Sequence, residues 1–174
     1  MACNVSSLRI NISKLSEGLH SHALSTDPGD IGLDDRFDTK VDVDARVEKS
    51  SRQLLLQVDS RSAGAFVCDR CLDEFRRDVK SHYTILYVLG QDAPSDAEES
   101  GAEIQYLPAD ANMIDLGEDV RQYLTLALPL KMLCKEDCAG LCPVCGGNKN
   151  KTACSCTVEE TDPRWAGLKR FLNN

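Results

Sequence analysis

Residues 41–58, VDVDARVEKSSRQLLLQV, decide the fold class of this chain. From Val41 to Val47, apolar and polar residues alternate with a period of two, which is typical of a strand with one buried face and one solvated face. The polar residues 49–51 predict a turn, and the apolar run at residues 54–58 predicts a second strand. Because the turn is short, the two strands are expected to pair antiparallel.

Neighbouring segments extend this pattern in both directions. Residues 8–12 alternate as a strand does, and residues 75–89 alternate through Val79, Tyr83 and Ile85. Residues 62–64, SAG, predict a further turn before the second of these strands. The sequence therefore predicts an antiparallel β-meander over residues 40–89, which could curl toward a barrel.

A helix is predicted over residues 116–128. Asp115 can cap its first turn, Glu118 adds negative charge there, and Pro129 ends it. Its apolar stripe is expected to pack on the sheet, which makes the fold class α+β.

The 174 residues predict two parts, a sheet-and-helix domain at 1–130 and a cysteine-rich tail at 131–174. Hydrophobic residues make up 42% of the chain, which is enough for a core in the first part. The tail is rich in glycine and cysteine, so metal would have to replace a core there. Asp162 and Pro163 predict a short terminal helix that contains Trp165, and residues 92–101 predict a mobile loop.

Eight of the nine cysteines form four close pairs, which is enough for two tetrahedral four-thiolate zinc sites. The CPVCG run at residues 142–146 is a zinc knuckle, and the pair at 154 and 156 follows shortly after it. One or two Zn²⁺ ions are therefore expected. The first predicted set is Cys142, Cys145, Cys154 and Cys156; the second is Cys68, Cys71, Cys134 and Cys138.

Other uses of these cysteines remain open. Cys134, Cys138, Cys142 and Cys145 are also close in sequence, so the eight ligands could be shared differently. Four cysteines can hold an iron–sulfur cluster, although the spacings match no familiar ferredoxin run. Cys68 and Cys71 could form a redox dithiol in which Arg70 favours the thiolate. Cys3 is left over as an ordinary thiol.

Charge and missing motifs exclude several function classes. The net charge of −8 argues against a simple electrostatic binder of nucleic acid. No apolar run approaches the ~20 residues of a membrane span, and no apolar signal segment opens the chain. A cytoplasmic protein is therefore expected, or one that sits in an organelle after losing a transit peptide. A four-thiolate zinc site has no open position for substrate, and no nucleophile elbow or phosphate-binding loop is present. The chain is therefore not expected to be an enzyme.

Taken together, these motifs resemble the YceD family, the large ribosomal RNA subunit accumulation proteins. The resemblance covers most of the chain and is carried by an ordered series of motifs: CDRCL at 68–72, ALPL at 127–130, LC at 133–134, CAGLCPVCG at 138–146, CSC at 154–156 and DPRW at 162–165. It implies a role in the accumulation or processing of large-subunit ribosomal RNA, with no enzymatic activity. It also implies that the eight paired cysteines are the family's cysteines, although some relatives lack much of the tail set.

Two kinds of partner follow from this interpretation. A direct contact with the large-subunit RNA precursor would use the basic residues near the cysteine pairs, namely Arg70, Arg76, Arg77, Lys149 and Lys151. An acidic chain also suits strongly basic ribosomal proteins. No small-molecule substrate is expected. The alternatives are a zinc-stabilised protein-interaction module without a ribosomal role, and the thiol redox protein that would use Cys68 and Cys71.

Overall fold

The structure is a computed structural model, and it describes residues 7–90 and 103–157. Contacts divide the chain into two compact units. The sheet unit contains Met1–Phe66 and Phe75–Met132, and the cysteine unit contains Val67–Glu74 and Leu133–Asn174. Residues 67–74, which the sequence assigned to the sheet domain, are thus grouped with the tail by their contacts. The predicted terminal helix, Cys3 and the acidic loop at 92–101 lie outside the described residues.

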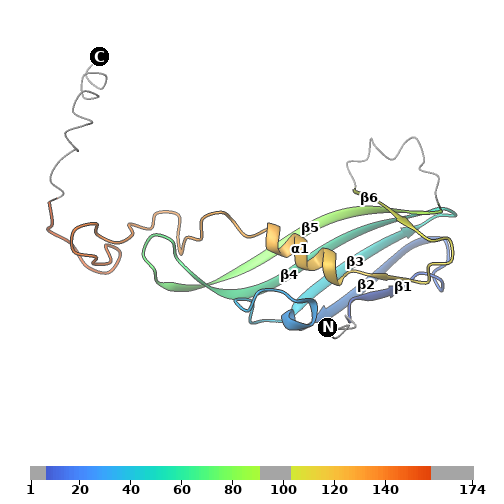
Figure 1. Cartoon of the computed structure of the whole chain (residues 1–174), viewed down its shortest axis with the longest axis horizontal. Helices are drawn as coiled ribbons and strands as arrows, with labels where there is room; N and C mark the ends of the chain where they lie inside the picture. The colour runs from blue at the N-terminus through green and yellow to red at the C-terminus, as the bar shows by residue number, and fades with distance from the viewer. Residues whose placement is uncertain (1–6, 91–102, 158–174) are drawn as a thin grey trace, which may run out of the picture. The chain divides into compact units, whose positions relative to one another are not determined.

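The sheet unit is built on a five-stranded sheet with the strand order β2-β3-β4-β5-β6 (Figure 1). Strands β2 to β5 form an antiparallel meander in sequence order, and β6 pairs with β5 in parallel. The elements of this sheet are β2 (Gly18–Thr26), β3 (Val41–Lys49), β4 (Gln53–Val67), β5 (Glu74–Leu89) and β6 (Glu103–Leu107). Among the described strands none joins β6 back to β2, so the sheet is open and the predicted curling has not closed a barrel.

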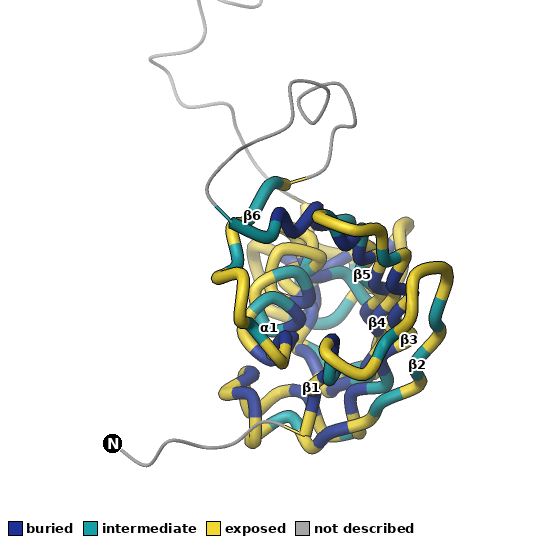
Figure 2. The backbone as a smooth tube through the Cα atoms, turned by 90° about the vertical axis from the view of Figure 1, so that its right-hand side faces the viewer, coloured by how far each residue is buried: buried dark blue, intermediate teal, exposed yellow. Residues whose placement is uncertain are grey.

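A second layer covers one face of this sheet (Figure 2). It contains the helix α1 (Gly117–Leu126) and a small antiparallel ribbon of β1 (Arg9–Asn11) and β7 (Met113–Asp115). A 3-10 helix, η1 (Pro28–Ile31), connects β2 toward β3. Val120 and Leu124 of α1 are fully buried in the same core as Val43 and Leu56. Burying each such side chain contributes roughly 1.5–3 kcal/mol, so apolar packing stabilises this unit.

Strand β3 follows the predicted period of two closely. Alternate residues of β3, from Val41 to Val47, are buried, while Asp44, Arg46 and Glu48 lie on the open face. The side chain of Asp115 accepts a hydrogen bond from the amide of Gly117 (3.0 Å), so it caps the first turn of α1 as its sequence position predicts.

The turn predicted at residues 62–64 is wrong, because β4 continues through them to Val67. Gly64 lies where another segment approaches the strand: a Cβ atom there would be 2.3 Å from the carbonyl oxygen of Arg36. The glycine therefore permits close backbone approach rather than a change of direction. Strands β6 and β7 were not predicted. Among the described residues, no helix combines the length and the apolar composition required to cross a membrane.

Candidate metal centres

The first cysteine pair lies in a tight turn between β4 and β5. The amide of Cys68 donates to the carbonyl of Asp73 (2.9 Å), and the amide of Leu72 donates to the carbonyl of Cys68 (2.9 Å). Closing the turn puts Leu72 at φ 58°, and it is the one non-glycine among the described residues with a positive φ. That left-handed conformation is costly for a leucine, so the turn is held in place by other contacts.

Residues 142–147 repeat this turn in the tail. The amide of Cys142 donates to the carbonyl of Gly147 (2.8 Å), and the amide of Gly146 donates to the carbonyl of Cys142 (2.8 Å). Gly146 has φ 72° and occupies the position that Leu72 occupies in the first turn. Glycine adopts this conformation without a steric penalty. The chain therefore contains two copies of one Cys-x2-Cys turn, and they differ at the left-handed position.

Each turn contributes two cysteines to a cluster of four. In the first tetrad the Cys68 and Cys138 sulfurs are 3.8 Å apart, and those of Cys71 and Cys134 are 3.7 Å apart. All four ligand atoms lie within 4.8 Å of one another. The first tetrad is Cys68, Cys71, Cys134 and Cys138.

The second tetrad lies entirely in the tail. The Cys154 sulfur is 3.4 Å from that of Cys142 and 3.5 Å from that of Cys145, and all four ligand atoms again lie within 4.8 Å. Its members are Cys142, Cys145, Cys154 and Cys156. The alternative in which Cys134 and Cys138 share an ion with Cys142 and Cys145 is not the grouping that these sulfur atoms adopt.

The sulfur spacing is that of a coordination site. A disulfide requires sulfur atoms about 2.0 Å apart, which is far shorter than the separations in either tetrad. Zinc–sulfur bonds of about 2.3 Å in a tetrahedron place the sulfurs about 3.8 Å apart, close to the values found here. Each tetrad could therefore hold a metal ion, and a set of four thiolates suits a soft or borderline cation.

The tetrads differ in their exposure to solvent. Three members of the first tetrad are buried, whereas Cys145 and Cys156 of the second are exposed. The side-chain amide of Asn150 also donates to the Cys138 sulfur (3.3 Å), a contact that orients a ligand and disperses its negative charge. We therefore expect the first tetrad to exchange an ion more slowly than the second.

Backbone amides favour one thiolate in each turn. Burial raises the pKa of Cys68, but the amide of Cys134 and two turn amides outweigh this effect and lower that pKa to about 6. The amides of Cys145 and Val144 likewise lower the pKa of Cys142 to about 6.

Further ionisation within a tetrad is opposed by the neighbouring sulfurs. Contacts with Cys154 and Cys145 raise the pKa of Cys156 to about 12. For Cys71 the amide of Asp73 favours the thiolate, but burial and the other thiols prevail and raise its pKa to about 12. Four thiolates so close together require a cation to balance their charge.

Burial argues against the redox alternative. The Cys68 and Cys71 side chains are 0% and 3% exposed, whereas reactive thiols are partly accessible to their oxidants.

Three of the five basic residues predicted to contact RNA have partners within the protein. Arg70 donates to the carbonyls of Cys138 (3.0 Å) and Glu136 (3.4 Å) in the cysteine unit. In the sheet unit, Arg76 forms a two-pronged ion pair with Asp38 at 2.5 and 2.7 Å.

Lys151 is the third, because its ammonium group lies 2.7 Å from the carboxylate of Asp73. Arg77 and Lys149 are exposed and have no side-chain partner among residues 7–90 and 103–157. These two side chains are therefore the free cations of the predicted set.

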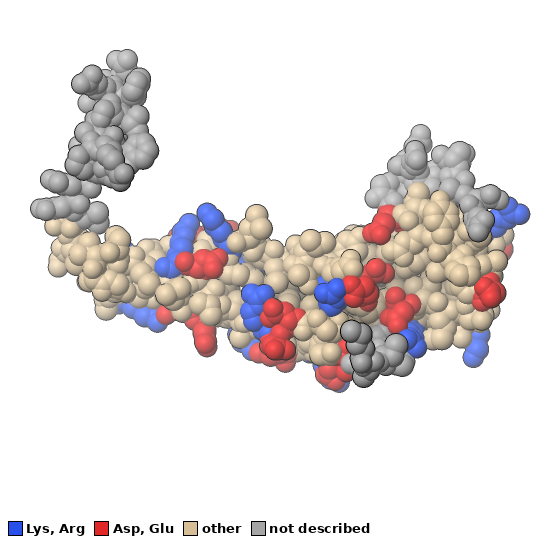
Figure 3. Space-filling view, in the orientation of Figure 1, with Lys and Arg blue, Asp and Glu red and all other residues tan. Residues whose placement is uncertain are grey.

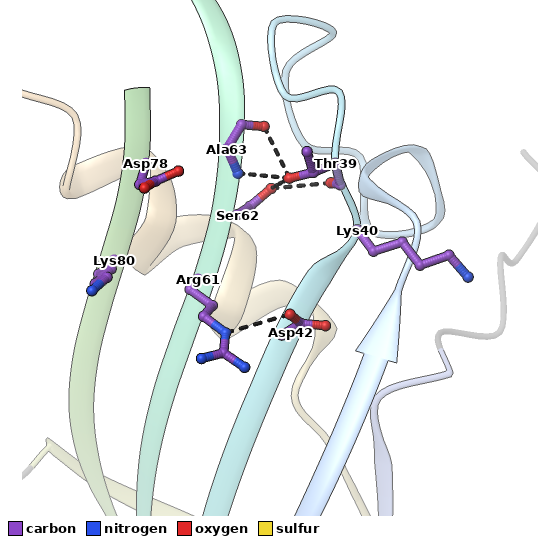
Figure 4. A pocket seen from close by; sticks show the side chains of 8 residues that line it. All are labelled: Thr39, Lys40, Asp42, Arg61, Ser62, Ala63, Asp78 and Lys80. Carbon is purple, nitrogen blue, oxygen red and sulfur yellow. Dashed lines mark hydrogen bonds and ion pairs between the residues drawn. The ribbon is translucent and has the colours of Figure 1, made fainter. Parts of the chain in front are cut away.

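The structure also shows a polar hollow that the sequence did not single out. It occupies about 260 Å³ on the open face of the sheet, where Arg61 of β4 points toward Asp42 of β3 (Figure 4). The alternating charges of β3 place polar groups on this face, but only the strand register brings these groups together. Its lining residues are Thr39, Lys40, Asp42, Arg61, Ser62, Ala63, Asp78 and Lys80.

Comparison with known proteins gives one family match. The model for the large ribosomal RNA subunit accumulation protein YceD matches residues 64–172, a span that contains both tetrads. An uncharacterized protein of Mycobacterium tuberculosis is 30% identical over 139 residues, which cover 76% of this chain and 62% of the relative. The chain thus spans less than two thirds of that relative's length.

Two plant relatives are more distant. The chloroplastic large ribosomal RNA subunit accumulation protein YCED homolog 1 of Arabidopsis thaliana is 24% identical over 153 residues, 75% of this chain and 48% of that protein. The protein of the same name from Zea mays is 25% identical over 145 residues, 70% of this chain and 49% of that protein. No solved structure matches.

Proposed function

The chain belongs to the YceD family, and we propose on this basis that it supports the accumulation of large-subunit ribosomal RNA. The observation that carries the proposal is the family match over residues 64–172, which includes every cysteine of both tetrads. The protein would act by binding, in the cytoplasm, as a factor in the assembly of the large subunit.

We propose that the ion in each tetrad is Zn²⁺. Four thiolates at tetrahedral spacing form a closed structural site in which no coordination position remains for water or substrate. The ion would fix the two cysteine turns and the segments after Leu133 in place of a hydrophobic core. This arrangement supports a non-enzymatic role, because four protein ligands leave no coordination position at which a substrate could bind.

Contact with RNA would be local rather than the work of a broad basic surface. On the face shown in Figure 3, basic side chains lie beside acidic ones. Arg77 and Lys149 could each reach a phosphate, whereas Arg70, Arg76 and Lys151 would first have to leave their partners. Basic ribosomal proteins therefore remain candidate partners alongside the RNA precursor.

The test is the ratio of large-subunit to small-subunit ribosomal RNA in cells that lack this protein. The ratio should fall, and the intact chain should restore it. Cys68→Ser, which removes one ligand of the buried tetrad, should fail to restore it, whereas Cys3→Ser should behave like the intact chain. An unchanged ratio in the deleted strain would refute the proposed role, while rescue by Cys68→Ser would refute only the need for the first tetrad.

A further inference from the structure

Strand β2 forms one edge of the five-stranded sheet, and among the described strands it pairs with β3 alone (Figure 2). Within residues 7–90 and 103–157, one hydrogen bond from outside the β2–β3 ladder reaches its backbone, from the Ser7 hydroxyl to the carbonyl of Ser25 (3.3 Å). The other outward amides and carbonyls of β2 have no hydrogen-bond partner among the described residues.

The sequence of β2, GLHSHALST, lacks the usual protection of an edge. It contains nine residues and has no lysine, arginine, aspartate, glutamate or proline, the residues that commonly block edge-to-edge pairing. Leu19 is 69% exposed. The opposite edge, β6, is only five residues long and begins with Glu103. An uncharged edge of this length is a ready template for an added strand.

The open face beside this edge is shallow. In the β2–β3 register, Ser21 lies opposite Arg46 and Ala23 lies opposite Asp44. These short β2 side chains leave a hollow that is lined by Asp44, Asp59 and Arg46 among others. Because neighbouring strands are about 4.8 Å apart, a strand added to β2 would lie about 10 Å from β3, within reach of long side chains that cross Ser21 and Ala23.

The carboxylates in this hollow are incompletely balanced. Asp44 lies directly opposite Asp59 in the β3–β4 register, an arrangement that destabilises a sheet. Asp59 accepts a hydrogen bond from His82 (2.9 Å). The Asp44 carboxylate has no ion-pair or hydrogen-bond partner among the described residues. A cation arriving from outside would relieve this repulsion.

We propose that the open edge of β2 accepts an extended segment of a partner protein, with lysine or arginine at alternate positions, as an added strand. Main-chain hydrogen bonds to β2 hold the segment, and its basic side chains cross Ser21 and Ala23 to reach Asp44. The proposal goes beyond the role in ribosomal RNA accumulation and requires no metal. A second copy of this chain suits the edge less well, because it carries the same net charge of −8 and the same acidic row.

The test uses the full chain and a labelled synthetic peptide of about ten residues in which lysine alternates with valine, measured by fluorescence anisotropy. The intact protein should bind this peptide and not a peptide with glutamate in place of lysine. Asp44→Lys should weaken binding by roughly tenfold or more, because it places like charge at the contact. Asp44→Lys should fold normally, since the new side chain faces Asp59 across the ladder.

The matched control is Asp78→Lys. It makes the same charge change at an exposed position of β5, outside the β2–β3 ladder. Its affinity should stay within about twofold of the intact chain. Hydrogen exchange should show new protection in residues 18–26 and not in residues 103–107 when the peptide binds. The proposal would be overturned if the two variants lost the same peptide affinity, or if β2 gained no protection from hydrogen exchange. Either result would mean that the peptide binds by unspecific charge attraction.

One further outcome would also overturn it. If the protein sediments as a dimer that Ala23→Lys converts to a monomer, the edge is occupied by a second copy. The peptide assay contains no RNA, so its result is independent of the ribosomal RNA ratio measured in cells.

Discussion

The two units of this protein reach a compact state by different means. In the sheet unit, most of the buried valine, leucine and isoleucine side chains from the strands and from α1 form one core, and Leu86 and Val88 form a smaller separate cluster. In the described part of the cysteine unit, the buried residues are four cysteines and Gly140. Apolar burial stabilises the first unit, whereas the described part of the second buries almost no apolar side chain other than cysteine, so we expect it to depend on a metal ion held by its cysteines.

Metal removal should have the largest effect and should separate the two units. Metal binding contributes on the order of 10 kcal/mol to the folding of small zinc modules, so a strong chelator should unfold the cysteine unit. The sheet unit should keep its structure. Limited proteolysis with mass spectrometry should show new cleavage after Leu133 and little within residues 41–58. Uniform cleavage of the whole chain would show that the two units do not differ in this way.

Leu56→Ala should produce the converse result. Leu56 is fully buried in the sheet core, and truncating such a leucine costs about 2–5 kcal/mol. Thermal unfolding followed by circular dichroism should report this loss, while elemental analysis should find the same metal content as in the intact chain. Loss of metal from a folded Leu56→Ala protein would show that the units depend on each other.

A smaller effect should distinguish turn geometry from burial in the cysteine unit. Leu72 is 62% exposed and has φ 58°, so Leu72→Gly should remove strain and stabilise the turn by up to about 1 kcal/mol. Gly146→Ala, at the matching position of the second turn, should destabilise by about 1 kcal/mol.

The metal affinity of both turn variants can be measured by competition with a chelator. The intact chain serves as the reference, and the two changes should move the affinity in opposite directions. If Leu72→Gly weakens metal binding as strongly as Gly146→Ala does, the apolar side chain matters more than the backbone conformation.

The smallest effect is electrostatic and belongs to α1. Hydrogen bonds from Arg121 and Gln122 lower the pKa of Glu118 to about 2. Because the folded pKa lies below the unfolded value, this carboxylate stabilises the sheet unit above about pH 4.5, and the contribution disappears as the pH falls toward 2. Glu118→Gln should slightly lower the melting temperature at pH 7 and make no difference near pH 2. The effect should be small because Glu118 is highly exposed and its ion pair is screened. An equal loss of melting temperature at both pH values would assign the effect to packing instead.

Part of the fold was predictable because its signals are local. The alternation of β3 and the cap and first turn of α1 depend on neighbouring residues, and the structure confirms these predictions. The strand β5 is also confirmed, but its predicted alternation stops at residues 85–88, which are all buried. The turn predicted at 62–64 failed because Gly64 serves a contact with Arg36, a residue far away in the sequence. The strands β6 and β7 are short and pair with distant strands, so periodicity had too few residues to indicate them.

The candidate site shows the same division. The spacing of the cysteine pairs indicated which residues could act as ligands, since each pair needs only a tight turn. Spacing could not decide which pairs share an ion, and it could not show that Arg70 and Lys151 are engaged by groups within the protein.

The amino-acid sequence by itself determined the alternating strands, the capped helix and the ligand chemistry of the four cysteine pairs, because each depends on residues within a few positions of one another. Only the tertiary structure decided the grouping of the sulfur atoms into two tetrads, the parallel addition of β6, and the uncharged edge of β2 beside Asp44. These features depend on strand register and on contacts between residues far apart in the sequence. A local sequence pattern does not show which of these contacts has the most favourable free energy.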